Sequence, residues 1–523
     1  MNVILISMQE NLCTFGIRYV FYETLKAGHR AILVYPNLRS EITEESRYLK
    51  FAEALPSFLR KNNPDVVGIS FMSYQSALVR RICGDIKRID PRVVLAGGGI
   101  HVTAFPESSL EFFDAVCLGE GEISFAEFLK CYEQKGSLEN MDVPGIVTAA
   151  GSARPRAAAP LFRDMDSLAV LPVMDESAFF YGAGRFAPIR AADVGRFQRY
   201  NGNGYDITTS RGCPLECTYC ADNINKNLYG NEWKRVRLRS VDHVMKELIA
   251  AVSSRPTIRF INFHDDSFTS RPLSWFQDFV PRYLRDIKLP LMFRMIPGSA
   301  NDDKYRLLSQ LSVIAAGIGL QSGSYRVLSE VYKRPVKIST FVETSRRLSG
   351  LRMMPIIDVM LDNPYEFRND IVETVETLAS LPKPFLLELY GFRFYPGTEI
   401  TARALKEGVI TECDLYKTQA TIESRGDKKF LNNIIFITPH IPAAFVRFLV
   451  RRENSLPVRC AMPLLTFYGS IMNAKNFLFM IVRSHGYNPV RIMKFLYLTA
   501  DPVTSICHAF PFLRNLITRG RQD

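Results

Sequence analysis

The sequence predicts an α/β protein with two successive parallel sheets and a mainly helical C-terminal region. Short apolar runs alternate with amphipathic stretches through residues 1–150, and the same alternation returns over residues 204–404. Alternation at this spacing is typical of parallel sheets whose crossover helices cover their faces. Residues 405–523 combine basic with apolar side chains and are expected to be mostly helical.

Residues 1–150 are predicted to form a doubly wound sheet with helices on both faces. Amphipathic stretches at 16–27, 45–61 and 76–89 separate apolar runs that are short enough for buried strands. The predicted strands span residues 3–7, 31–35, 66–71, 93–98 and 115–118.

Glycine-rich loops follow three of these strands, at residues 68–73, 97–101 and 119–122. Glycine in such a loop often does no more than allow a tight turn. Ligands of open α/β sheets, however, bind beyond the carboxyl ends of the strands. The three loops are therefore candidate ligand contacts.

Residues 151–203 are predicted to be a linker with one hairpin, because glycine, proline and arginine interrupt any periodicity. Residues 204–404 then supply six strand–helix units, which predict a partial parallel barrel with its site at the carboxyl ends of the strands. The predicted strands span residues 205–209, 258–263, 291–296, 313–320, 354–361 and 385–394.

Three cysteines lie directly after the first predicted strand of this barrel, in Arg-Gly-Cys-Pro-Leu-Glu-Cys-Thr-Tyr-Cys. Cys213, Cys217 and Cys220 are close enough to hold one iron–sulfur cluster, whose irons normally take four cysteine ligands. With three ligands, one iron stays open to a small molecule, as in catalytic metal sites. A zinc site completed by a distant histidine is the alternative, although zinc cysteines usually come in Cys-x-x-Cys pairs.

The spacing of these cysteines, with Tyr219 before the last, resembles the signature of the radical S-adenosylmethionine (SAM) enzymes. The resemblance implies a [4Fe–4S] cluster on Cys213, Cys217 and Cys220, with SAM bound to the open iron and cleaved to a 5′-deoxyadenosyl radical. Relatives often carry Glu-Ser-Gly where this chain has Gln321, so a charged role is lost there. The implied SAM contacts are Tyr219, Asp265, Asp266, Gln321, Ser322, Arg326 and Asp362.

Residues 65–73, 95–106 and 116–125 resemble the flavodoxin-like cobalamin-binding domain that precedes many radical SAM domains. The loop at 8–15 lacks the cobalt-ligating histidine of the Asp-x-His-x-x-Gly motif, so no protein imidazole ligand is expected there. The implied cobalamin contacts are Ser70, Ser73, Gly97, Gly98, Gly99, His101, Gly119, Glu120 and Gly121.

Residues 358–366 and 395–399 are similar to the cobalamin-dependent subgroup that includes methyltransferases and the anaerobic magnesium-protoporphyrin ester cyclase. This resemblance implies an enzyme that methylates an unactivated centre of a small-molecule or lipid-like substrate. Radical cyclisation, rearrangement or another C–H functionalisation without methyl transfer stays open. A non-catalytic cobalamin or cluster sensor is a third hypothesis.

No nucleic-acid partner is expected. Radical SAM methylthiotransferases, which modify transfer RNA, carry further cluster cysteines upstream of the three-cysteine loop. Cys13, Cys83, Cys117 and Cys131 show no such spacing. An electron donor such as flavodoxin or ferredoxin is expected, in a reducing cytoplasm. The first residues read directly as a strand, without the features of a signal peptide.

The net charge of +12 is concentrated near the C-terminus, where residues 430–523 carry 11 Lys+Arg and 3 Asp+Glu. Residues 460–482 are apolar, but Asn473, Lys475 and Asn476 interrupt them, so a membrane-spanning helix is not expected. Three hypotheses remain for this region: substrate binding, peripheral contact with the inner membrane surface, or an ordinary helical subdomain with a solvated basic face.

Overall fold

The computed structural model describes residues 1–9, 11–36, 44–149, 160–171, 178–182, 185–190, 194, 203–416 and 427–485. The chain forms two compact units. The first unit contains Met1–Gly202, Ser210–Pro256 and Phe394–Ala420, and the second contains Asn203–Thr209, Thr257–Arg393 and Thr421–Asp523.

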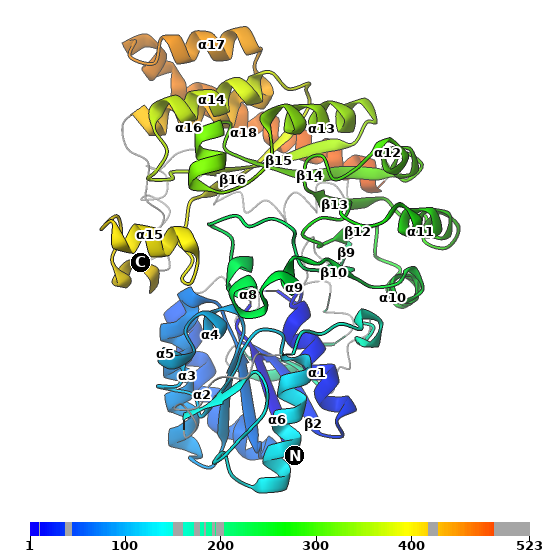
Figure 1. The fold of residues 1–523 in the computed structure, drawn as a ribbon, viewed down its shortest axis with the longest axis vertical. Helices are drawn as coiled ribbons and strands as arrows, with labels where there is room; N and C mark the ends of the chain where they lie inside the picture. Colours follow the sequence, from blue (N-terminus) through cyan, green and yellow to red (C-terminus); the bar gives the residue numbers. More distant parts are fainter. Residues whose placement is uncertain are drawn as a thin grey trace. The chain divides into compact units, whose positions relative to one another are not determined.

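The first unit is built on an eight-stranded sheet in the order β6-β5-β4-β3-β1-β2-β7-β8. Figure 1 shows this unit with its helices α1–α6 labelled. Its five-stranded centre is parallel and follows the flavodoxin-like order 2-1-3-4-5. This confirms the predicted doubly wound sheet. The strands are β1 (Asn2–Ser7), β2 (Arg30–Tyr35), β3 (Val66–Ser70), β4 (Val94–Gly98), β5 (Ala115–Cys117), β6 (Ile146–Thr148), β7 (Phe179–Gly182) and β8 (Phe186–Pro188).

Alternate side chains of β1 bury two separate cores, one on each face of this sheet. Ile4 and Ile6 pack in the core that contains Val79 of α3, whereas Val3 and Leu5 pack in the other core. A central parallel strand is therefore apolar throughout, because both of its faces are covered. The helices are α1 (Phe15–Lys26), α2 (Glu44–Asn62), α3 (Ser76–Ile89), α4 (Ile100–Ala104), α5 (Pro106–Ser109) and α6 (Gly121–Lys135), with the short 3-10 turns η1 (Ser73–Gln75) and η3 (Met165–Ser167).

The segment that was predicted to be a linker contributes to this sheet. The expected hairpin is present, since β7 pairs antiparallel with β8, but β7 also pairs in parallel with β2 and extends the sheet. Leu33, Val34 and Tyr35 of β2 provide the apolar edge that β7 joins. Residues 151–159, 172–177, 183–184, 191–193 and 195–202 of the predicted linker lie outside the described residues.

The first unit also contains the cysteine segment and a later helix. β10 and β11 form a two-stranded antiparallel hairpin around the cysteine loop and two helices. The elements are β10 (Ser210–Arg211), α8 (Asp222–Tyr229), α9 (Asn231–Lys234), β11 (Arg237–Leu238), α10 (Val241–Ser254), α15 (Glu399–Lys406) and η6 (Glu412–Tyr416).

The second unit is built on six parallel strands in sequential order, which confirms the predicted partial barrel. β9 and β16 are its two edges, so the sheet is open between them. The strands are β9 (Gly204–Ile207), β12 (Phe260–Phe263), β13 (Leu291–Met295), β14 (Val313–Gln321), β15 (Met354–Leu361) and β16 (Leu386–Gly391). The connecting helices are α11 (Leu273–Asp286), α12 (Asp302–Leu308), η5 (Val327–Val331), α13 (Ile338–Gly350) and α14 (Arg368–Ala379).

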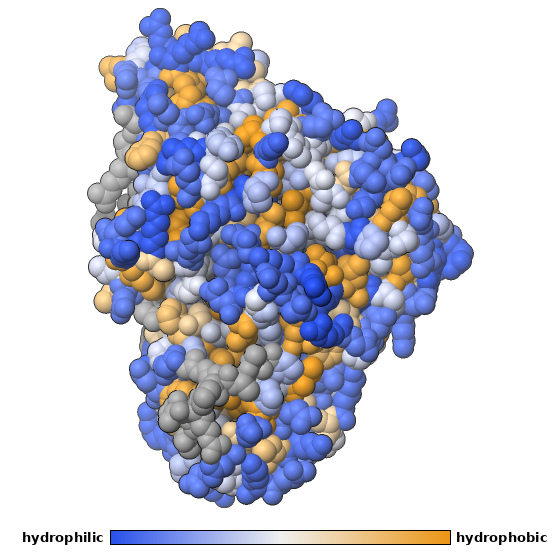
Figure 2. All heavy atoms as spheres, viewed as in Figure 1, coloured by the Kyte–Doolittle hydropathy of each residue, from blue (hydrophilic) through white to orange (hydrophobic). Residues whose placement is uncertain are grey.

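The C-terminal region of the second unit is helical as predicted, with α16 (Asp427–Ile437), η7 (Thr438–His440), α17 (Ala443–Arg451) and α18 (Leu456–His485). α16 packs against α14, α17 and α18. On the face shown in Figure 2, hydrophilic residues cover most of the surface and apolar residues are scattered among them. Within the described ranges, every helix is too short or too polar to cross a membrane. Residues 486–523 lie outside these ranges.

The predicted domain boundaries at 150, 203 and 404 stay predictions. The compact units divide the chain differently, because Ser210–Pro256 groups with the first sheet although it lies between two strands of the second. The cysteine loop thus follows β9 in the chain and belongs to the first unit.

Candidate functional site

The cysteine loop is a compact turn that leads into α8. The Cys220 amide donates to the Cys217 carbonyl oxygen at 3.0 Å, and the Asn223 side chain donates to the same oxygen at 2.7 Å. Cys217 is buried, whereas Cys213 and Cys220 are half-buried. These bonds fix the backbone between the second and third cysteines.

The donor set suits an iron–sulfur cluster. Cys213, Cys217 and Cys220 form no disulfide, and thiolates are the ligands that such clusters take. Within the described ranges, no three histidine, cysteine or acidic side chains converge on a single-ion site.

Gly212 fixes the entry to the loop. Its φ is +97°, and a Cβ there would lie 2.6 Å from the Trp233 carbonyl oxygen and 2.8 Å from that of Arg235. Only glycine combines this left-handed backbone with so close an approach. Any side chain at residue 212 would therefore displace the backbone immediately before Cys213.

The Tyr395–Glu399 string packs beside the cysteine loop. The Ile400 amide donates to the Thr218 carbonyl oxygen at 3.2 Å, which ties α15 to the loop. Gly397 has a φ of +80°, and a Cβ there would lie 3.1 Å from both Ile224 of α8 and Ala104 of α4. The glycine of this string thus allows the chain to pass close to two helices.

The two acids predicted to contact SAM after β12 separate in the structure. Asp265 is buried and accepts hydrogen bonds from the Thr209 amide at 2.7 Å and the Thr209 hydroxyl at 2.6 Å. Its Oδ2 also pairs with Arg271 at 2.9 Å, and both side chains are fully buried. Asp265 therefore joins the end of β9 to the loop after β12. Asp266 is exposed, and both acids stay predicted SAM contacts.

Strained backbone marks the carboxyl ends of two neighbouring strands. Gln321 ends β14 with a φ of +67°, and Asp362 follows β15 with a φ of +65°. Residues other than glycine adopt this region at a cost of about 1–3 kcal/mol each, and such residues cluster at active sites and ligand clamps. The Asn432 side chain of α16 donates to Asp362 Oδ1 at 2.7 Å and orients that carboxylate. Both residues stay predicted SAM contacts.

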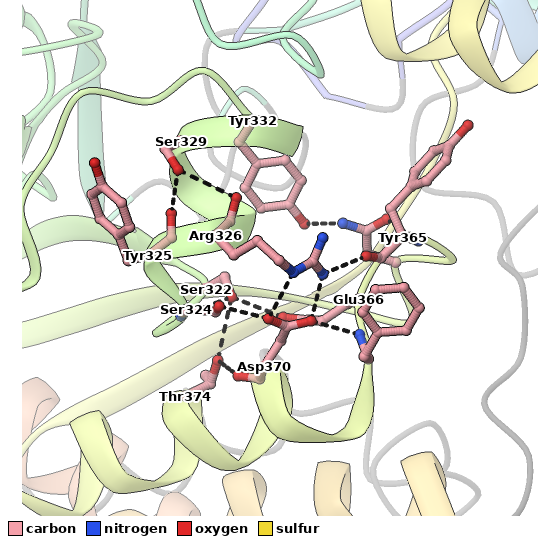
Figure 3. Close-up of polar contacts among 12 residues, drawn as sticks. Ser322, Ser324, Tyr325, Arg326, Ser329, Tyr332, Tyr365, Glu366, Asp370 and Thr374 are labelled. Carbon is pink, nitrogen blue, oxygen red and sulfur yellow. Dashed lines mark hydrogen bonds and ion pairs between the residues drawn. The ribbon is translucent and has the colours of Figure 1, made fainter.

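Ser322 and Arg326, the other predicted SAM contacts of this strand end, belong to a polar network with α14 (Figure 3). The buried Ser322 hydroxyl donates to Glu366 at 2.8 Å, and the Arg326 guanidinium pairs with Asp370 at 2.5 Å. Arg326 also donates to the Tyr365 carbonyl oxygen at 2.8 Å. The network supports the turn after β14, so a contact with SAM would require these side chains to exchange partners.

Glu366, which the sequence did not single out, gives this network a pH dependence. Burial raises its pKa to about 7, although the Ser322 hydroxyl opposes the rise. The folded state then binds a proton that the unfolded state releases near pH 4.5. Its stabilising contribution of about 3 kcal/mol is complete below pH 4.5 and is lost as the pH rises through 7.

We expect the urea midpoint of the second unit to fall between pH 5 and pH 8, and Glu366→Gln to flatten this fall, because the amide cannot ionise. Urea unfolding at several pH values measures both slopes. Equal slopes for the wild type and the variant would contradict the assignment.

One face of the second sheet is polar. Parallel register places Asp206 beside Asn262 and Gly319 beside Asp358, which in turn lies beside Glu388. Arg294 reaches across β14 to Asp358 at 2.6 Å and also pairs with Glu388. The reach is possible because Gly317 lies beneath it, where a Cβ would be 2.9 Å from Arg294 Cγ.

One carboxylate oxygen on this face, in Asp358, accepts no hydrogen bond from the described residues. Burial raises the pKa of Asp358 to about 6 against the influence of Arg294. The Asp358 Oδ1 atom is buried and has no hydrogen-bond partner among the described residues. Arg294 is already neutralised by two carboxylates, so the face suits a cation or a hydrogen-bond donor better than an anion.

The predicted cobalamin loops meet at the carboxyl edge of the first sheet. Ser7, Ser70 and Gly98 share one register line at this edge. A Cβ at Gly98 would have no described atom within 4 Å, whereas Gly99 has a φ of +97° and approaches the Phe71 carbonyl oxygen. An edge with serine hydroxyls and an uncovered glycine backbone can accept a flat ligand.

Several of the predicted cobalamin residues have internal partners. A Cβ at Gly97 would lie 2.7 Å from the Phe113 ring, so this glycine allows close packing. His101 is 1% exposed, its Nδ1 lies 3.1 Å from the Ser73 hydroxyl, and burial lowers its pKa to about 4. The structure therefore gives His101 a packing role and a neutral ring.

The third loop is covered by the cysteine segment. A Cβ at Gly119 would lie 2.1 Å from the Tyr229 hydroxyl, and the Glu120 amide donates to that hydroxyl at 2.7 Å. Gly121 packs against Val20. The Glu120 carboxylate binds Arg211 and Arg237. None of these pairings was visible from the sequence, since their partners lie about 90 to 120 residues away.

Two known families match the chain. Residues 1–129 match the B12 binding domain, and residues 207–378 match the Radical SAM superfamily.

Curated relatives extend this match. An uncharacterized methyltransferase of Pyrococcus horikoshii is 23% identical over 371 residues, which cover 68% of this chain and 72% of that protein. The cobalamin-dependent radical SAM methyltransferase TokK of Streptomyces tokunonensis is 27% identical over 164 residues, which cover 30% of this chain and 22% of TokK.

Solved structures share the fold. The radical SAM methyltransferase TsrM of Kitasatospora setae, with tryptophan substrate and a SAM analogue bound, superposes with a TM-score of 0.61 at 16% identity, covering 78% of this chain and 77% of TsrM. The cobalamin-dependent radical enzyme OxsB with aqua-cobalamin bound gives a TM-score of 0.62 at 14% identity, covering 100% of this chain and 80% of OxsB.

Proposed function

We propose that this chain, an enzyme of the radical SAM superfamily with a B12 binding domain, methylates an unactivated centre of a small-molecule or lipid-like substrate. Its cofactors are a [4Fe–4S] cluster, SAM and cobalamin. One observation carries the proposal. A three-cysteine loop follows the first strand of a sequential parallel sheet, downstream of a sheet with 2-1-3-4-5 order.

Different residues of the chain would hold the different cofactors. When bound, the cluster and SAM supply one-electron cleavage of a carbon–sulfur bond, and cobalamin supplies a methyl carrier. Cys213, Cys217 and Cys220 would hold the cluster. Asp266, Gln321 and Asp362, at three strand ends, would orient SAM. The edge formed by Ser70, Gly98 and Gly99 would hold cobalamin.

The polar face of the second sheet supports a substrate with a donor group. Arg294, Asp358 and Glu388 together carry one net negative charge when both carboxyl groups are ionised, and the buried Asp358 Oδ1 has no hydrogen-bond partner among the described residues. A protonated nitrogen or a hydroxyl group would satisfy that oxygen. Relatives are consistent with a small molecule, since TsrM binds tryptophan.

Products distinguish methyl transfer from other radical outcomes. Reconstituted, reduced enzyme is supplied with methyl-labelled SAM and a small-molecule extract of the cells that naturally produce the protein. We expect 5′-deoxyadenosine and S-adenosylhomocysteine to accumulate together, with label in a third product. Formation of 5′-deoxyadenosine without S-adenosylhomocysteine or labelled product would contradict methylation and favour cyclisation or rearrangement.

The remaining partners follow from the chemistry. Reduction of the cluster requires an outside one-electron donor, for which a flavodoxin or ferredoxin in the reducing cytoplasm is suitable. Contact of the C-terminal region with a membrane surface stays a prediction. The observation in its favour is that α18 exposes Leu456, Leu464 and Ile471.

A further inference from the structure

Two arginines face each other in the hairpin that carries the cysteine loop. Arg211 of β10 is the direct cross-strand partner of Arg237 of β11. Like charges directly opposite each other destabilise a strand pair. Both side chains are also largely buried, with 15% and 10% exposure. The hairpin therefore needs anions from elsewhere in the fold.

Those anions come from the loop between β5 and α6 of the first sheet. Glu120 Oε1 lies 3.1 Å from Arg211, and Glu120 Oε2 lies 2.8 Å from Arg237. Glu122 Oε1 lies 2.5 Å from the second terminal nitrogen of Arg211. Both carboxylates are at least nine-tenths buried, so the two pairs form a neutral, desolvated group.

Arg211 immediately precedes the cluster loop. Gly212 follows it in a conformation that only glycine adopts readily, and Cys213 comes next. A guanidinium held by two carboxylates fixes the backbone one residue before that glycine. The position of the first cysteine is thus tied to Glu120 and Glu122.

A second connection runs from the same loop to Gly212. The Glu120 amide donates to the Tyr229 hydroxyl at 2.7 Å. The Tyr229 and Trp233 rings stack with centroids 5.6 Å apart, and the Trp233 carbonyl oxygen lies against Gly212. Two independent paths therefore join residues 119–122 to the start of the cysteine loop.

We propose that Glu120 and Glu122 are positioning residues for the iron–sulfur site, which they align by holding Arg211 against the B12-binding sheet. This inference rests on the proposed function only through the assignment of Cys213, Cys217 and Cys220 as cluster ligands. The loop after β5, whose residues 119–121 are implied cobalamin contacts by the family resemblance, would thereby also act on the cluster.

The ionisation of the pair supports this arrangement. Burial works to raise the pKa of Glu120, but the hydrogen bond from Arg237 and the charges of Arg211 and Arg237 lower it overall. Glu120 is consequently ionised at neutral pH.

Glu122→Gln tests the proposal, since the amide keeps the size of the side chain and removes its charge. The matched control is Glu247→Gln, which breaks the buried Arg239–Glu247 pair of the same unit, at 2.7 Å and 0% and 1% exposure. Each full-length protein is reconstituted anaerobically. Iron per chain, the electron paramagnetic resonance spectrum of the reduced cluster and thermal unfolding are then compared.

We expect Glu122→Gln to lower cluster affinity about 10-fold and to alter the resonance spectrum, as loss of an outer-shell partner does at other metal sites. Glu247→Gln should unfold at a temperature similar to that of Glu122→Gln but should keep the wild-type spectrum. Arg211→Lys, which keeps the charge but loses the two-pronged contact, should show the same direction of change if Glu122→Gln does not fold. Wild-type iron content and spectrum in the folded variants would overturn the proposal. Failure of the wild type to bind iron would refute the cluster assignment instead.

Discussion

Cys217→Ala is expected to reduce iron binding to background and to abolish 5′-deoxyadenosine formation. Cys217 is the buried member of the three, and its carbonyl oxygen accepts from both Cys220 and Asn223. Two remaining thiolates cannot retain a cluster whose irons each need a ligand. Iron and sulfide analysis after anaerobic reconstitution, followed by product quantification, measures both effects.

Cys460→Ala is the matched control. Cys460 is exposed on α18 and lies far from the loop in the sequence, so its removal takes away one thiol without touching the site. The control should retain wild-type iron. Full iron in Cys217→Ala would mean that this residue is not a ligand.

Gly323→Ala is expected to destabilise the second unit by about 3 kcal/mol. A Cβ at residue 323 would lie 2.4 Å from the Thr374 Cα and 2.7 Å from the Glu373 carbonyl oxygen, both of which are backbone atoms of α14. The Gly323 amide also donates to the Thr374 hydroxyl at 2.7 Å. The helix would have to move away from the end of β14, where Gln321 and Ser322 lie. Urea unfolding measures the loss.

Gly350→Ala provides the comparison within the same unit. Gly350 ends α13, and a Cβ there would have no described atom within 4 Å. Alanine loses less conformational entropy on folding than glycine, so this variant should lie within about 1 kcal/mol of the wild type. Equal stability of the two variants would show that α14 does not pack on Gly323 as described.

The strands of both sheets could be predicted because each is a short apolar run between amphipathic helices. Residues 354–361 were predicted as a strand, and β15 spans Met354–Leu361. The predicted helix at 76–89 coincides with α3. The linker prediction was wrong in one respect, since β7 adds to the first sheet. The frequent glycines of this segment obscured the strand pattern of β7, which is stabilised by pairing with β2.

The cluster ligands could be predicted because their signal is local, with three thiols inside eight residues. Contacts made over long sequence distances could not. The resemblance implied Glu120 as a cobalamin contact, and its pairing with Arg211 and Arg237 could not be predicted. Asp265 was placed beside SAM because it ends a strand, but Thr209 and Arg271 occupy its carboxylate. A strand-end acid looks the same in sequence whether it faces a ligand or a buried arginine.

Cofactor stoichiometry after anaerobic reconstitution with iron, sulfide and cobalamin tests the central claim most directly. The claim is that one chain holds both an iron–sulfur cluster and cobalamin. We expect optical spectra and metal analysis to show both bound to the same protein, with the cobalamin retained after gel filtration. A protein that loads the cluster but releases all cobalamin would contradict the claim.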